Sequence, residues 1–265
     1  MTDPRLFAAL EGLVARHARD GHVPLIGVAG AQGSGKTTLA RAAAARLGAA
    51  QFSLDDVYLD RAARGELART VHPLFATRGP PLTHDLGLMA RTAVELRAAG
   101  PGARTLLPAF DKRADGPVAP AEQPRFAGRP AAILIDGWCL GATPQAEAEL
   151  VAPINALERE QDPDGVWRHR VNAALAGDYA AAFDAFDAIL FLAAPTFEVV
   201  LDWRCEQEAA LLGTTPAALP AADRARIAGF VLGFERLTRS MLAGGVHAAT
   251  VVALDRDRAV TSVLS

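Results

Sequence analysis

Short apolar runs alternate with polar or alanine-rich stretches along the chain, and this alternation predicts strands separated by helices. We predict strands at Pro24–Ala29, Gln51–Leu54, Ala131–Ile135, Ala188–Leu192 and Thr250–Leu254, with a weaker one at Thr105–Phe110. Most of these runs are apolar at consecutive positions, which is typical of strands buried on both faces. The pattern therefore predicts an α/β fold with a parallel sheet covered by helices on both faces.

Helical spacing of apolar residues is clearest in two stretches. Thr37–Leu47 is rich in alanine, the best helix former. His84–Ala99 has Thr83 as its predicted N-cap and Gly100-Pro101 as its stop. A further helix is expected within residues 1–22.

Two stretches rich in helix breakers divide this pattern. Asp111–Pro130 combines proline, glycine and charge, and we predict an irregular surface loop there. Gly213–Ala222 interrupts two helical stretches. Neither has the character of a domain linker, so we expect residues 1–265 to form a single domain with helical insertions.

The composition narrows the class of protein. The 265 residues are 51% apolar and 22% charged, and the net charge of −3 argues against a nucleic-acid scaffold. No apolar run approaches ~20 residues, so no membrane span is expected. The N-terminus lacks an apolar signal-peptide core, and Cys139 and Cys205 form no paired motif. These features together favour a cytoplasmic protein.

One motif carries chemistry by itself. Residues 30–37 fit the phosphate-binding loop pattern G-x-x-x-x-G-K-[ST], between a predicted strand and a predicted helix. Lys36 is expected on the β- and γ-phosphates of a nucleotide, and Thr37 on Mg²⁺. Of the 27 basic residues only Lys36 and Lys112 are lysines, and a compact ammonium suits this position better than a guanidinium. The expected nucleotide contacts are Gly30, Ala31, Gln32, Gly33, Ser34, Gly35, Lys36, Thr37 and Thr38.

Acidic residues follow two of the predicted strands. In an open α/β sheet the carboxyl ends of the strands border the ligand crevice. Asp55 is placed there to accept a proton from an attacking hydroxyl, and Asp136 to hold Mg²⁺ or its water shell. For Asp56 a helix cap or a solvated loop position is an equal alternative.

The loop and Ser53-Leu54-Asp55-Asp56-Val57-Tyr58 together resemble the signature of the phosphoribulokinase, uridine kinase and pantothenate kinase superfamily. Within it, further stretches between residues 24 and 258 look like D-glycerate 3-kinase and its kinase-like relatives. These stretches are Arg78–Asp85, Pro108–Lys112, Asp136–Gly141, Trp203–Glu208 and Phe234–Arg239.

The resemblance implies roles for individual residues. Asp55 aligns with the catalytic base, and Arg204 falls where an arginine of a lid would contact the transferred phosphate. The acceptor side would be formed by Tyr58, Arg78, His84, Asp85 and Lys112. Some of these have plain structural alternatives: a surface ion pair for Arg78 or Arg204, a structural imidazole for His84, and a helix-dipole contact for Asp85. Trp138, Trp167 and Trp203 are expected to be packing residues.

The sequence also departs from the family on the acceptor side. Leu82 stands where relatives have glycine in Gly-Thr-His-Asp, and no Gly-x-Gly-Asp-Arg follows Lys112. Asp136 replaces a commoner glutamate.

From the motifs and the resemblance together we expect an ATP- and Mg²⁺-dependent kinase for a small hydroxylated metabolite, with D-glycerate as first choice. Pantothenate, a nucleoside or a sugar phosphate remain alternative acceptors, and a nucleotide-binding regulator without turnover remains an alternative class. The motif by which GTPases read guanine is absent from the sequence.

Overall fold

The computed structural model describes residues 3–19 and 21–265, and its centre is a six-stranded, mainly parallel sheet. The strand order is β10-β9-β8-β1-β7-β2, so β1 is an interior strand and the loop that follows it begins at the middle of the sheet edge. The strands are β1 (Leu25–Gly30), β2 (Ala50–Ser53), β7 (Ile133–Gly137), β8 (Ala188–Ala193), β9 (Thr250–Leu254) and β10 (Val260–Leu264). The α/β fold and its five main strands are confirmed within about two residues.

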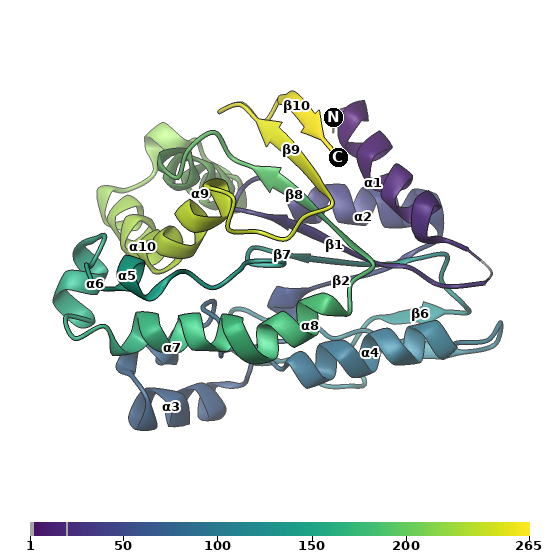
Figure 1. Cartoon of the computed structure of the whole chain (residues 1–265), viewed down its shortest axis with the longest axis horizontal. Helices are drawn as coiled ribbons and strands as arrows, with labels where there is room; N and C mark the ends of the chain where they lie inside the picture. Colours follow the sequence, from purple (N-terminus) through teal and green to yellow (C-terminus); the bar gives the residue numbers. More distant parts are fainter. Residues whose placement is uncertain (1–2, 20) are drawn as a thin grey trace.

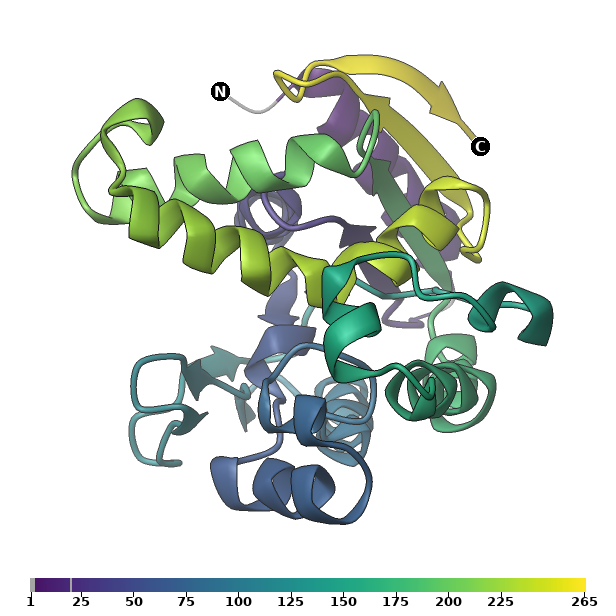
Figure 2. The same ribbon diagram turned by 90° about the vertical axis from the view of Figure 1, so that its left-hand side faces the viewer.

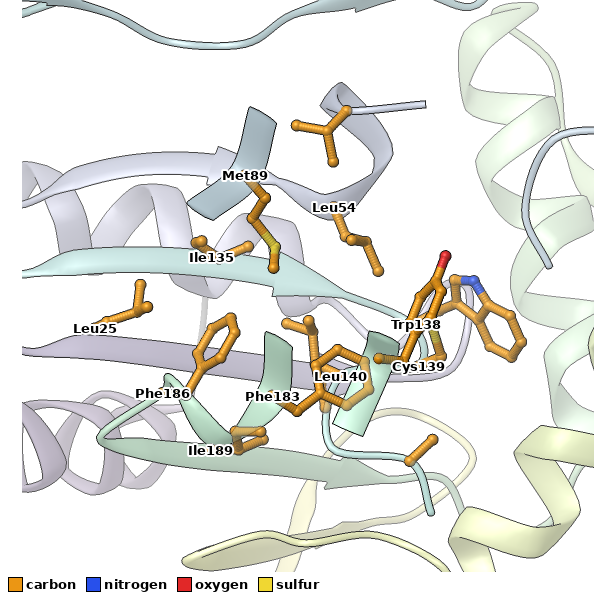
Figure 3. Close-up of a cluster of buried hydrophobic side chains, with 14 of the residues drawn as sticks. Leu25, Leu54, Met89, Ile135, Trp138, Cys139, Leu140, Phe183, Phe186 and Ile189 are labelled. Carbon is orange, nitrogen blue, oxygen red and sulfur yellow. The ribbon is translucent and has the colours of Figure 1, made fainter. Parts of the chain in front are cut away.

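Helices cover both faces of this sheet, as predicted (Figure 1). On one face lie α1 (Pro4–His17) and α2 (Lys36–Leu47), and on the other α4 (Leu86–Ala98), α7 (Val166–Ala174) and α8 (Ala180–Asp184). Side chains along β1 point alternately to the two faces of the sheet. Ile26 and Val28 join the first core, which lies under α1 and α2, and Leu25 and Ala29 join the second core, on the opposite face. Figure 3 shows the second core, where Met89, Phe183 and Phe186 pack against strand residues.

The remaining elements lie outside the main sheet and its two helical layers. They are α3 (Arg61–Thr70), α5 (Glu147–Leu150), α6 (Ala156–Gln161), α9 (Glu198–Leu211) and α10 (Ala221–Leu242), with the hairpins β3 (Arg104–Leu106)–β6 (Arg125–Ala127) and β4 (Phe110–Asp111)–β5 (Gly116–Pro117). Figure 2 shows α9 and α10 side by side, with their connection projecting from the sheet. Among the described residues, no helix combines the length and the apolar character needed to cross a bilayer.

Three local predictions differ from the structure. α4 begins at Leu86 with Asp85 as its N-cap, because the hydroxyl of Thr83 instead bonds within the preceding turn. Thr105–Phe110 is divided between the two hairpins outside the main sheet, and Asp111–Pro130 contains their second strands. Of the predicted N-terminal segment, residues 1, 2 and 20 lie outside the described residues, and Pro4–His17 form α1. β10 was not predicted, because four of its five residues are exposed and form no apolar run.

Candidate active site

The phosphate-binding loop joins β1 to α2 and is shaped by backbone conformations that favour glycine. Gly33 and Gly35 have φ values of 82° and 89°. The side chain of Ser34 is buried, and its Oγ has no hydrogen-bond partner within the described chain. A buried hydroxyl without a partner beside a helix N-terminus fits a phosphate oxygen, so this loop has the features of a phosphate cradle.

The loop is held from outside by α9 and by the turn after β9. A side chain at Gly33 would overlap Trp203 Cβ, so only glycine allows this close approach. Arg258 Nε donates to Gly33 O at 2.6 Å, and its guanidinium lies 4.9 Å from the centre of the Trp203 ring. Trp203 is therefore a packing residue, as predicted, but what it packs against is the phosphate-binding loop.

At the base of the loop, Thr37 and Asp136 are in direct contact. Thr37 Oγ1 donates to Asp136 Oδ2 at 2.5 Å, and Gln51 Nε2 donates to Asp136 Oδ1 at 2.8 Å. Burial raises the pKa of Asp136, and the Thr37 hydrogen bond and the Lys36 charge oppose that rise. A hydroxyl and a carboxylate on one side of the phosphate loop are oxygen ligands of the type that Mg²⁺ takes beside nucleotide phosphates.

A cavity of about 460 Å³ adjoins the phosphate-binding loop. A second cavity, of about 480 Å³, lies against α8 and contains none of the predicted site residues. The cavity beside the loop contains seven of the predicted site residues, contributed by segments far apart in the sequence. Its lining includes Gln32, Lys36, Asp55, Tyr58, Arg78, Lys112 and Arg204. Burial lowers the pKa of Lys36, while Asp55 and Asp136 act in the opposite direction.

Asp55 lies between a buried phenol and an exposed ammonium. Tyr58 Oη donates to Asp55 Oδ1 at 2.8 Å, and Lys112 Nζ donates to Oδ2 at 2.6 Å. Desolvation alone would raise the pKa of Asp55, but Lys112, Lys36 and Tyr58 together lower it to about 2. Asp55 is thus a carboxylate at neutral pH. Burial raises the pKa of the neighbouring Asp56 to about 6, and its Oδ2 accepts the Ser53 N–H at 2.8 Å.

Arg78 approaches the cavity from the segment before α4. Its Nη1 donates to Asp115 Oδ1 at 2.7 Å, and the other oxygen of Asp115 lies 2.6 Å from Arg64 Nη2. Arg64 is buried, so Asp115 ties the β4–β5 hairpin to a fixed cation of α3. The surface ion pair considered for Arg78 therefore exists, although Arg78 also lines the cavity.

Arg204 extends from α9 toward the loop. Its Nη1 donates to Gln207 Oε1 at 2.6 Å, and its Nε is buried without a partner in the described chain. Glu208 lies between Arg204 and Arg226, with 2.8 Å to Arg226 and 3.9 Å to Arg204. The two arginines give this wall of the cavity a positive charge that Glu208 offsets in part.

His84 and Asp85 are not brought to the cavity. The His84 ring is buried and stacks on Tyr58 at 4.7 Å between centroids, and its Nδ1 lies 2.6 Å from Tyr179 Oη. Burial lowers the pKa of His84 to about 4, so the imidazole is neutral. Asp85 Oδ1 caps α4 by accepting the Leu88 N–H at 2.7 Å. For both residues the structural alternative matches the geometry.

Several lining residues were not predicted as site residues. They are Trp138, Glu208, Leu211, Arg226, Ile227, Phe230 and Phe234. Trp138 was assigned to packing, and it does pack edge-on against Phe234, with its Nε1 donating to Gly79 O at 2.9 Å. The sequence held one signal for the α10 residues: positions 226, 227, 230 and 234 recur at helical spacing and share a face.

Comparison with known proteins identifies the type of protein that carries this site. No protein-family model matches the chain. The uncharacterized kinase mug58 of Schizosaccharomyces pombe is 31% identical to it in an alignment of 209 residues that covers 72% of this chain and 72% of that protein. The chain belongs to the same family of P-loop kinases as this relative.

Solved structures agree with this kinase in fold. The D-glycerate 3-kinase of Cryptococcus neoformans is 20% identical, with a TM-score of 0.76 over 99% of this kinase and 98% of that chain. A putative fructose transport system kinase of Silicibacter is 21% identical, with a TM-score of 0.56 over 92% and 95%. As a P-loop kinase the protein uses an ATP-type nucleotide and a small-molecule acceptor.

Proposed function

We propose that this kinase transfers the γ-phosphoryl group of ATP to the primary hydroxyl of a small hydroxy acid, with D-glycerate as first choice. One observation carries the proposal: the P-loop lysine, a carboxylate and two further cations line the same cavity, as Lys36, Asp55, Arg78 and Lys112. A hydroxy acid needs a proton acceptor for its hydroxyl and cations for its carboxylate, and this set offers both.

The nucleotide side follows from the loop. The backbone of residues 30–38 would surround the phosphates, with Lys36 and Arg204 placed to neutralise charge on the transferred group. Thr37 and Asp136 would hold Mg²⁺, which neutralises charge on the phosphates when bound. The oxygens of Thr37 and Asp136 already lie 2.5 Å apart, and Ser34 Oγ has no hydrogen-bond partner among the residues that the structure describes.

On the acceptor side, Asp55 would orient the attacking hydroxyl and take its proton. The new bond forms between the hydroxyl oxygen and the γ-phosphorus as ADP leaves with the electrons of the bond that breaks. Arg78 is the cation suited to grip a carboxylate with two parallel hydrogen bonds. The fold shared with a D-glycerate 3-kinase supports the choice of acceptor, and Leu82 in place of the family glycine is the reason to test others.

The test is a coupled assay of ADP release with Mg·ATP and a panel of D-glycerate, L-glycerate, pantothenate, uridine and ribose 5-phosphate. We expect D-glycerate to stimulate ADP release most, with 3-phosphoglycerate identified by ³¹P NMR. Stronger stimulation by another compound would keep the kinase mechanism and replace the acceptor. ADP release that ignores every acceptor would instead favour the nucleotide-binding regulator.

A further inference from the structure

The two lysines of the chain line the same cavity, which also contains the carboxylate of Asp55. All other basic positions are arginine, yet Lys36 and Lys112 both line the cavity around Asp55. Lys36 has a known reason to be lysine in the phosphate loop. Lys112 has none from that motif, and a flexible ammonium differs from arginine in forming single, readily exchanged contacts.

In the resting structure, both oxygens of Asp55 are engaged. Tyr58 occupies Oδ1 at 2.8 Å and Lys112 occupies Oδ2 at 2.6 Å. A hydroxyl that is to give its proton to Asp55 needs hydrogen-bond access to one of these oxygens. An ammonium in contact with Oδ2 competes with the hydroxyl for that oxygen and weakens the carboxylate as a proton acceptor.

Of the two partners, Lys112 is the one able to leave. Tyr58 is 7% exposed, and its ring is fixed by the His84 stack at 4.7 Å. The Lys112 side chain is 54% exposed and extends from the β4–β5 hairpin. The hairpin itself is tied down by Asp115 through Arg64 and Arg78, so only the lysine side chain has to move.

We infer that an anionic acceptor draws Lys112 away from Asp55, so that the base becomes available only when the acceptor is bound. The inference rests on the proposed function. The carboxylate of the acceptor replaces that of Asp55 as the partner of the ammonium, and Asp55 keeps the hydrogen bond from Tyr58 and the nearby charge of Lys36. The acceptor hydroxyl then donates to Asp55 Oδ2, attacks the γ-phosphorus as the bond to the leaving ADP oxygen breaks, and passes its proton to Asp55. A water molecule has no negative charge and so does not draw Lys112 away from Asp55. Because the base then stays paired, ATP is protected from hydrolysis.

The first test needs no acceptor. Lys112→Met removes the ammonium but keeps much of the side-chain length, and Lys112 is exposed enough for the variant to fold. We expect hydrolysis of Mg·ATP in water to rise about tenfold or more, because Asp55 is then always free to orient water. The matched control is Arg113→Ala, which removes an exposed cation from the same hairpin and should leave hydrolysis unchanged. A rate in Lys112→Met no higher than in the unaltered kinase would overturn the inference.

The second test compares D-glycerate with D-glyceramide, which has the same shape without the charge. In the unaltered kinase we expect kcat for the amide to be lower by about tenfold or more, because Lys112 stays on Asp55. In Lys112→Met, kcat for the amide should rise and approach that for glycerate, whereas KM for glycerate increases. If Lys112 only bound the carboxylate, the amide would gain nothing, and that result would also overturn the inference.

A third variant separates charge from mobility. Lys112→Arg retains the cation but can hold Asp55 by two parallel hydrogen bonds, so we expect slow turnover of both acceptors and no rise in hydrolysis. Failure of the proposed function looks different from failure of this inference. In the first case the unaltered kinase does not phosphorylate D-glycerate. In the second it does, but Lys112→Met leaves hydrolysis and amide turnover unchanged.

Discussion

The phosphate side of the cavity is made of backbone and strand ends, whereas the acceptor side is made of long side chains from surface segments. Gly33, Thr37 and Asp136 belong to central strands or to the loop and helix directly attached to them. Arg78 comes from a bend, Lys112 from the turn between β4 and β5, and the α10 residues from an outer helix. A rigid site suits a group that is the same in every cycle, and adaptable side chains suit the part that sets specificity.

Substitution of Lys36 should give the largest effect and tests the phosphate side. We expect Lys36→Ala to lower kcat about 10³-fold or more, because a charge in contact with the transferred phosphoryl is lost from a pre-organised site. The coupled ADP assay measures this loss. Arg41→Ala, a change of an exposed cation on the same helix, is the control and should stay near the original rate. A loss of similar size in both variants would remove Lys36 from its proposed role.

Asp55 lies where the phosphate side and the acceptor side of the cavity meet, and its substitution should give the next largest loss of activity. Asp55→Asn keeps the shape but cannot accept a proton, so kcat should fall about 10²-fold or more. Nucleotide affinity should change little, because no phosphate contact is removed. Equilibrium titration with a fluorescent ATP analogue measures that affinity. Equal losses in affinity and turnover would assign Asp55 to nucleotide binding instead.

On the acceptor side, Arg78→Met should raise KM for the acceptor about tenfold and change kcat less, because it removes a binding contact. Initial rates over a range of acceptor concentrations separate the two constants. Arg104→Met, at an exposed position on β3, is the matched control. A fall in kcat with KM unchanged would show that Arg78 acts in the transition state and not in acceptor binding.

The smallest effect is on stability and concerns Asp56. Its pKa of about 6 in the folded chain lies above the usual 3.8, so its contribution to stability is present below pH 3.8 and is lost as pH rises through about 6. Asp56→Asn has no charge to bury and keeps an oxygen for Ser53 N–H. We expect the variant to gain about 1–2 kcal/mol relative to the unaltered protein on going from about pH 4 to about pH 7.5, measured by urea unfolding. An equal difference at both pH values would contradict the burial of this carboxyl.

The same contrast explains what the sequence could and could not predict. The phosphate loop is one contiguous motif between a strand and a helix, so its residues and neighbours follow from local pattern. Lys112 contacts Asp55 across 57 positions and His84 meets Tyr179 across 95. No local pattern encodes such contacts, because they depend on how distant segments pack.

His84 illustrates this limit well. Its place beside Asp85 in a family stretch made it a substrate candidate. Its burial depends on Tyr58 and on Tyr179 at the end of the π-helical stretch Leu175–Tyr179, which the sequence did not locate. The face of α10 that lines the cavity was readable as a helical stripe, but not its direction. The strands were located because continuous apolar runs leave few other structures for those residues.

The contact between Gly33 and Trp203 also bears on how the enzyme can move. It fixes α9 to the phosphate loop near Trp203, about 12 Å along the helix from Leu211 at 1.5 Å per residue. α9 also packs along its length on α10, and Glu208 pairs with Arg226 there, so the two helices would move as one unit. In a rotation of that unit about the contact with Gly33, Arg204 would stay near the phosphate loop and the connection after Leu211 would move furthest. Such a rotation would open the acceptor side while the nucleotide side stays covered.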